Sequence, residues 1–218
     1  MRGAILQSIR DTLNSARSTQ SLEPNRWAAA SGWFRGEHLT SPPAIAKQRH
    51  LLNVFRSRRH HILIEAGTYK GETTAFFAQH AEHVYSVELH QELFAAAEKR
   101  FAAQSNVTLI HGDSLIEIPK LVANCQGDPP LVFLDGHFSG MGTAEGIEME
   151  PAESTLRKLT DVAPPGTTIV IDDLRLFGSG LAGFPQLDTI TAAARTAFPR
   201  AVIRTGLDSI VIEVASEG

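Results

Sequence analysis

The chain has 218 residues, of which 43% are hydrophobic and 20% charged, and a formal net charge of −4. Such a composition is typical of a globular protein with a substantial core, and the absence of a long basic run excludes the charge pattern of a nucleic-acid-binding protein. No apolar run approaches the roughly 20 residues of a membrane-spanning helix, and the single cysteine, Cys125, excludes an internal disulfide and is typical of a reducing compartment. We therefore expect a cytoplasmic protein with no nucleic-acid or membrane partner.

The first 60 residues differ in pattern from the rest of the chain. The periodicity predicts helices over 1–17 and 44–57, and in the second of these Ile45, Leu52 and Phe55 share one face. The segment between them carries both tryptophans and several turn residues. We interpret residues 1–60 as a helical extension or lid on a domain formed by 61–218. The sequence leaves open whether the extension is a lid or a dimerisation element, and whether the protein is a monomer or a homo-oligomer.

From residue 62 onward, short apolar segments alternate with helical ones. Strands are predicted within 61–67, 83–89, 107–112, 131–136 and 167–173. Helical patterns over 73–81, 91–104 and 114–125 separate the first four, and the segment 151–163 lies between the fourth and the fifth. This alternation predicts a parallel sheet with helices on both faces.

The end of the chain breaks this alternation. After a helical pattern over 184–198, two strand-like runs at 199–206 and 208–215 are separated by a single residue. So short a link permits only an antiparallel hairpin. The expected fold class is therefore α/β, with a Rossmann-like, mostly parallel sheet that ends in an antiparallel hairpin.

Acidic residues occur at the end of each of the five predicted parallel strands. Ligands of an open α/β sheet bind outside the carboxyl ends of its strands, so carboxylates should surround the crevice there. This arrangement disfavours a pyrophosphate, which is bound by helix N-termini and cations, and favours a ligand with hydroxyl groups and positive charge. Any single acid could instead cap a helix or face solvent. The acids are Glu65, Glu88, Asp113, Asp135 and the pair Asp172 and Asp173.

The stretch ILIEAGTYKGETT, Ile62–Thr74, predicts a strand, a tight loop and a helix. It lacks the third glycine of the dinucleotide fingerprint and the Gly-Lys-Ser/Thr of a P-loop. A strand, glycine loop and helix followed by an acid 23 residues on, at Glu88, is also compatible with a nicotinamide-dependent oxidoreductase, which stays an alternative. The missing glycine, the surrounding acids and the terminal hairpin count against it.

From Ile62 to Val214 the sequence resembles the class I S-adenosylmethionine-dependent methyltransferases, whose first motif, E-x-G-x-x-x-G, is similar to E-A-G-T-Y-K-G here. The resemblance implies that 61–218 is the S-adenosylmethionine-binding methyltransferase domain. It also implies a set of cofactor-binding residues. Glu65, Gly67 and Thr68 would hold the methionine part, Glu88 the ribose hydroxyls, Asp113 and Ser114 would lie beside the adenine, and Asp135 would complete the set.

The second half of the chain, with FLDGHFSGMGTAEG, PAESTLRKL and IVIDDLRLF, resembles small bacterial methyltransferase-like proteins. More distantly it is similar to the macrocin-type sugar O-methyltransferases and the cephalosporin hydroxylase group. This resemblance implies that Asp135, Asp172 and Asp173 bind Mg²⁺. It further implies that His137 is the general base, so that His137 and Asp135 are the catalytic candidates.

The residues themselves leave alternatives open at this site. The side chains of Asp172 and Asp173 would point to opposite sides of a continuing strand, and they converge only if the chain turns there. One of the two could therefore cap a helix or pair with Arg175. Arg175 could hold an acidic group of the substrate or pair with an acid of the chain, and His137 could be a structural loop residue.

The expected function is transfer of a methyl group from S-adenosylmethionine to a hydroxyl, on a sugar or another small metabolite, assisted by a divalent metal. The partner would be a small-molecule or glycan acceptor, whose identity the sequence does not reveal. The alternatives are the nicotinamide-dependent oxidoreductase and a non-catalytic S-adenosylmethionine-binding protein.

Overall fold

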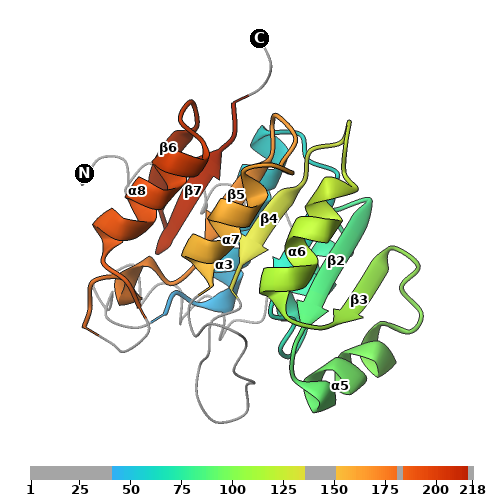
Figure 1. The fold of residues 1–218 in the computed structure, drawn as a ribbon. Coiled ribbons are helices and arrows are strands. Elements are labelled where there is room, and N and C mark those ends of the chain that lie inside the picture. The colour runs from blue at the N-terminus through green and yellow to red at the C-terminus, as the bar shows by residue number, and fades with distance from the viewer. Residues whose placement is uncertain (1–40, 136–150, 181–183, 216–218) are drawn as a thin grey trace.

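The computed structural model describes residues 41–135, 151–180 and 184–215. These form a seven-stranded sheet with the order β3-β2-β1-β4-β5-β7-β6 (Figure 1). The first five strands are parallel, and β7 pairs antiparallel with both β5 and β6. The predicted sheet and its terminal hairpin are thus confirmed. The strands are β1 (Ile62–Ala66), β2 (His83–Glu88), β3 (Val107–His111), β4 (Leu131–Leu134), β5 (Thr168–Ile171), β6 (Val202–Gly206) and β7 (Ser209–Glu213).

Helices lie between and before these strands, as the alternation predicts. One of them, α6, begins at an N-cap, because an oxygen of the Asp113 carboxylate accepts a hydrogen bond from the Leu115 amide at 2.8 Å. The helices are α3 (Ala44–Ser57), α4 (Glu72–Phe77), α5 (Gln91–Phe101), α6 (Ser114–Ala123), α7 (Ala152–Leu159) and α8 (Leu187–Ala197), with a 3₁₀ turn η1 (Leu174–Leu176).

The central strands are buried on both faces, because helices cover the sheet on each side. Every residue of β4, β5 and β7 is buried, whereas the edge strands β3 and β6 are partly exposed. On one face α6, α7 and α8 pack on the sheet through Ile118, Leu156 and Ile190, each of them fully buried (Figure 1). Such two-sided burial explains the nearly continuous apolar runs in the sequence.

The opposite face of the sheet is covered by α3 and α4. Leu52 and Phe55 of α3 join Phe77 of α4 in a second core against Leu63 and Phe133 of the sheet. The helix predicted over 44–57 is confirmed by α3, and its apolar face lies against the sheet. The boundary of the predicted extension at residue 60 stays a prediction, because residues 1–40 lie outside the described ranges.

His60 connects the chain before β1 to the amino-terminal edge of the sheet. Its Nδ1 lies 2.8 Å from the carbonyl oxygen of Pro129, and its Nε2 lies 2.8 Å from Oγ1 of Thr168. The side chain is buried, and this burial lowers its pKa. His60 is therefore a structural residue at the end of the sheet opposite the acids.

Among the helices of the described ranges, none has the length and apolar character needed to cross a membrane.

Candidate active site

Three of the acids lie at one level of the sheet because the strands that carry them are in register. Ala66 of β1 pairs with Val87 of β2 and with Leu134 of β4, and Leu134 pairs with Ile171 of β5. The residues that follow these partners include three acids, Glu88, Asp135 and Asp172. The carboxyl ends of β1 and β4, where the strand order reverses, are the position at which open α/β sheets bind ligands.

The same acids also share one face of the sheet. Side chains of a strand alternate between its two faces, so Asp135 lies on the face of Phe133, and Asp172 on that of Val170. Phe133 and Val170 belong to the core beneath α3 and α4. By this alternation the acids at the strand ends project toward α3 and α4, which determines the residues that they can contact.

The loop between β1 and α4 is held in a tight conformation by its backbone. Gly67 and Gly71 have φ angles of 83° and 70°, which glycine adopts without strain. Tyr69 also has a positive φ, of 49°, which is uncommon for a residue with a side chain. The Gly71 amide donates to the carbonyl of Thr68 at 2.7 Å, and the Gly67 amide to that of Val87 at 2.9 Å. The predicted strand, tight loop and helix are thus present.

Glu65 is buried behind this loop and is hydrogen-bonded to hydroxyl groups. Its Oε2 accepts hydrogen bonds from Thr74 at 2.5 Å and from Ser86 at 2.6 Å. The hydroxyl of Thr68 lies 2.7 Å from that of Ser86, which extends this network to the loop. Burial raises the pKa of Glu65 to about 7, although the two hydrogen bonds act in the opposite direction.

Glu88 is buried at the end of β2 and joins two loops. Its Oε2 accepts a hydrogen bond from the Tyr69 amide and its Oε1 one from the His90 amide, both at 2.8 Å. A carboxylate has about four lone-pair positions, so each oxygen can accept a further bond. Glu88 therefore stabilises the glycine loop and still has acceptor capacity for a ligand.

Asp113 and Ser114 lie at the start of α6, beyond the end of β3. The Asp113 carboxylate caps the helix, as the alternative interpretation of a strand-end acid suggests, and Ser114 is the first residue of the helix. The cluster of carboxylates that the described residues form at the ends of β4 and β5 does not include Asp113. The place of Asp113 and Ser114 beside an adenine stays a prediction.

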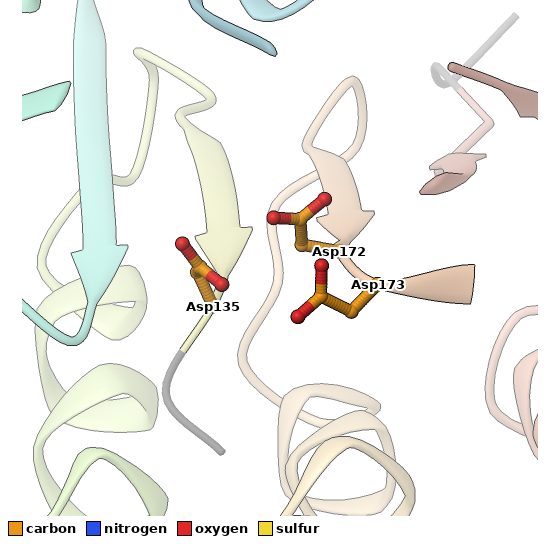
Figure 2. A group of neighbouring side chains, drawn as sticks. All are labelled: Asp135, Asp172 and Asp173. Atoms are coloured by element: carbon orange, nitrogen blue, oxygen red, sulfur yellow. The ribbon is translucent and has the colours of Figure 1, made fainter. Parts of the chain in front are cut away.

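The carboxylates of Asp135, Asp172 and Asp173 form a cluster at the ends of β4 and β5 (Figure 2). One oxygen from each lies within 4.8 Å of the others. Asp173 has a left-handed conformation, with φ 55° and ψ 40°, and starts the turn η1. The chain therefore turns at this point, and the side chains of the two adjacent aspartates converge instead of pointing to opposite sides of a continuing strand.

Two cations bind this cluster, and one of them was not predicted. Lys47 of α3 forms ion pairs with Asp172 and with Asp173, whose Oδ1 lies 3.0 Å from Nζ. Arg175 binds the same Oδ1 of Asp173 at 2.5 Å and also pairs with Asp208. Of the two roles considered for Arg175, the structure shows the pairing with acids of the chain.

The acids of the cluster differ in their protonation behaviour because their surroundings differ. Burial, and then the neighbouring Asp172, raises the pKa of Asp135. Burial also raises the pKa of Asp172, and Lys47 offsets only part of this effect. Burial acts on Asp173 too, but Lys47 and Arg175 outweigh it and lower its pKa. Asp135 and Asp172 are thus the two acids whose negative charge is least compensated.

The donor set of the cluster is suitable for a divalent cation. All three ligand candidates offer carboxylate oxygen, which Mg²⁺ prefers. When ionised, the four carboxylates of Asp135, Asp172, Asp173 and Asp208 exceed the two cations Lys47 and Arg175 by two negative charges. A divalent cation would neutralise this excess. The residues therefore fit the ion, although Lys47 already contacts two of the three acids.

His137, the candidate general base, lies outside the described residues, as does the rest of 136–150. Its role stays a prediction. Lys47 was not among the predicted site residues, because it lies 125 residues before Asp172 on the helix that precedes the sheet. A signal was present in the sequence: Lys47 shares an i, i+4, i+7 stripe with Leu51 and Val54, both of which are buried.

Solved structures with the same architecture define the class of fold. An S-adenosylhomocysteine-bound methyltransferase from Podospora anserina has a TM-score of 0.59 and 14% identity, covering 97% of this chain and 96% of its own. A protein from Staphylococcus aureus described as a putative caffeoyl-CoA O-methyltransferase gives 0.58 and 12%, with coverage of 97% and 100%. An O-methyltransferase of tomaymycin synthesis from Streptomyces achromogenes gives 0.54 and 15%, with coverage of 95% and 96%. The fold is that of the class I methyltransferases.

Sequence comparison leads to the family. The family model described as "Methyltransferase domain" matches residues 64–174, which are 111 of the 218 residues and extend from β1 to η1. The chain belongs to this family of methyltransferase domains.

Curated relatives match over a shorter part of their length. A protein-L-isoaspartate O-methyltransferase from Dinoroseobacter shibae is 40% identical over 81 residues, 33% of this chain and 37% of that protein. One from Photobacterium profundum is 33% identical over 103 residues, 46% of each chain. The chain thus spans less than half the length of these relatives.

Proposed function

We propose that this protein is an S-adenosylmethionine-dependent methyltransferase that methylates a hydroxyl group of a sugar or another small metabolite, with assistance from a divalent cation. The observation that carries the proposal is the set of carboxylates on one face at the carboxyl ends of adjacent strands, beside a glycine loop without phosphate-binding features. The methyl donor has two ribose hydroxyls, an ammonium and a sulfonium, and no phosphate. Carboxylates suit such a molecule better than lysines do.

In this proposal the first two strands hold the donor. Glu88 accepts hydrogen bonds from the ribose hydroxyls with the lone pairs that Tyr69 and His90 leave free. Glu65, Gly67 and Thr68 hold the methionine part, and the buried Glu65 carboxylate favours a positively charged neighbour. Asp113 and Ser114 lie beside the adenine. These roles rest on the resemblance together with the positions of Glu65 and Glu88 at the strand ends.

The acid cluster would serve the acceptor. Methyl transfer requires a positioned nucleophile that loses its proton, and a sugar hydroxyl is too weakly acidic to ionise by itself. A divalent cation on Asp135, Asp172 and Asp173 would lower the pKa of an acceptor oxygen when bound. His137 is the candidate for taking the proton. We include in this proposal the more specific resemblance to the macrocin-type sugar O-methyltransferases.

Oxygen as the acceptor atom has independent support. The D. shibae and P. profundum relatives are named O-methyltransferases. Their names specify a protein acceptor, whereas the acid cluster proposed to bind a metal here suits a hydroxyl of a small molecule or glycan. The partner is therefore proposed to be such an acceptor and not a protein.

A transfer assay tests this function. Purified protein is incubated with methyl-labelled S-adenosylmethionine, Mg²⁺ and a library of sugars, phenols and small metabolites that carry hydroxyl groups. We expect label in at least one acceptor, with activity lost on chelation and in Asp172→Asn. Full activity in the chelated enzyme would reject the metal assistance. Binding of the donor without any turnover would favour a non-catalytic S-adenosylmethionine-binding protein.

A further inference from the structure

Lys47 lies among the acids at the ends of β4 and β5 although it belongs to a distant part of the chain. It is separated from Asp172 by 125 residues and precedes the segment 64–174 that the methyltransferase family model matches. Its side chain is 19% exposed, and its ammonium binds both Asp172 and Asp173. The cluster therefore contains a cation supplied by an element outside the matched domain.

The backbone of Lys47 is held in place by the contacts of its neighbours on α3. The side-chain amide of Gln48 donates to the carbonyl of Glu72 at 3.2 Å, at the start of α4. Nε2 of His50 lies 3.1 Å from Oγ of Ser209 on β7, and Leu52 is fully buried in the core. The flexible side chain of Lys47 is therefore the part that would move if the ammonium left the acids.

The two acids depend on Lys47 to different degrees. Asp173 Oδ1 also binds Arg175, which keeps a cation beside it in the absence of Lys47. Asp172 has Lys47 as its only ion-pair partner within the residues that the structure describes. Asp135 has no ion pair to a described residue, yet its carboxylate lies within the same 4.8 Å group. Lys47 thus binds two of the three carboxylates that a cation held by all three acids would need.

We propose that Lys47 is a built-in cation that competes with a divalent metal for Asp172 and Asp173, and so sets the metal affinity of the site. The inference rests on the metal site of the proposed function. Without metal, Lys47 holds the adjacent carboxylates together. When a metal binds, the Lys47 ammonium is released from Asp172, because both cations carry positive charge and would need the same two carboxylates at close range.

Titration of Mn²⁺ by calorimetry tests the competition directly. Lys47→Met removes the ammonium, and we expect it to bind Mn²⁺ on the order of 10-fold more tightly, because it removes a positive charge that repels the ion at close range. Lys47→Arg retains a cation and should bind close to the wild type. Lys120→Met is the control, because Lys120 pairs with Glu117 on the exposed surface of α6 and should leave the affinity unchanged. Unchanged or weaker binding by folded Lys47→Met would overturn the proposal.

A measurement on the wild-type protein does not depend on the variant folding. Acetylation of lysines, followed by mass spectrometry, reports how accessible the Lys47 amine is. We expect slow acetylation of Lys47 without metal and at least several-fold faster acetylation with saturating Mn²⁺. An unchanged rate while Mn²⁺ binds would contradict the displacement.

Measurements on the same samples distinguish a failure of the Lys47 competition from a failure of the proposed methyltransferase function. If neither the wild type nor Lys47→Met binds Mn²⁺, the competition is rejected. S-adenosylhomocysteine is then titrated into the same proteins without metal. Binding of S-adenosylhomocysteine would support the methyltransferase function even though the competition is rejected. Absence of binding would reject the methyltransferase function as well.

Discussion

Glu88 combines a structural and a proposed binding role in one carboxylate. Its oxygens hold the amides of Tyr69 and His90, so the conformation of the glycine loop and the site of the ribose depend on the same side chain. Hydrogen bonds to a charged group contribute about 1.5–3 kcal/mol each. A change at Glu88 should therefore affect both the folding free energy and the affinity for the donor.

We expect Glu88→Ala to weaken binding of S-adenosylhomocysteine about 10-fold or more, since the ribose loses its acceptor. Calorimetry gives the dissociation constant, and urea denaturation gives the accompanying loss of stability. Glu82→Ala changes an exposed acid in the turn before β2 and serves as the control. Wild-type affinity in a folded Glu88→Ala protein would reject the ribose role.

Glu65 should make stability depend on pH. Its pKa is about 7 in the folded protein and near 4.5 without the fold, because burial disfavours the charged form. The folded state then binds more protons than the unfolded state between these values. The stabilisation is full below about pH 4.5 and is lost as the pH rises through about 7.

Glu65→Gln tests this dependence because glutamine has a similar shape and does not titrate. The free energy of unfolding of the wild type relative to the variant should fall by on the order of 3 kcal/mol between pH 4.5 and pH 8. Asp135 and Asp172 titrate in both proteins, and the charge of Glu65 makes only the smallest of the contributions to the raised pKa of Asp135, so the difference comes mainly from Glu65. Urea denaturation at several pH values supplies the measurement, and a difference that does not vary with pH would refute the assignment.

At the scale of the elements, the junction between the glycine loop and α4 has little room. Gly71 has a φ of 70°, and a Cβ atom there would lie 2.6 Å from Cε2 of Phe101 on α5. An alanine would therefore add a steric clash to an unfavourable backbone conformation. The loop, α4 and α5 are consequently fixed relative to one another through this glycine.

Gly71→Ala should lower the free energy of unfolding by about 2–5 kcal/mol, the sum of backbone strain and overpacking. Gly127→Ala separates the two effects, because Gly127 has a φ of 91° but no atom within 4 Å of the added Cβ. We expect only the strain, about 1–2 kcal/mol, in this control. Equal losses in the two variants, measured by urea denaturation, would show that Phe101 imposes no constraint.

The helix α3 was predictable as an element, but its contacts with the acids were not. Its position and length were predicted from the apolar face of Ile45, Leu52 and Phe55, because helical periodicity is a local property of the chain. The partners of Lys47 are 125 and 126 residues away, and only the packing of α3 across the sheet brings them together. Periodicity could indicate that Lys47 lies on the face of α3 that packs on the sheet, but not which acids neutralise it.

For the whole molecule, the sheet could be predicted because each strand is a short apolar run that ends in turn residues or acids. The hairpin of β6 and β7 followed from a link too short for a crossover. The convergence of Asp172 and Asp173 could only be stated as a condition, since the left-handed conformation of Asp173 depends on its tertiary contacts. The pairing of Arg175 with Asp208, 33 residues away, required the folded chain for the same reason, whereas the capping by Asp113 is a local contact and was among the alternatives for a strand-end acid.

The central claim is that the acids at the strand ends bind S-adenosylmethionine and its product. Calorimetric titration of S-adenosylhomocysteine into the wild-type protein, with Mg²⁺ present, tests it most directly. We predict one site with a dissociation constant in the micromolar range, which corresponds to about −8 kcal/mol. Absence of heat at millimolar S-adenosylhomocysteine would contradict the account. The protein would then share only its fold and family with the methyltransferases, and NADH would be the next ligand to test.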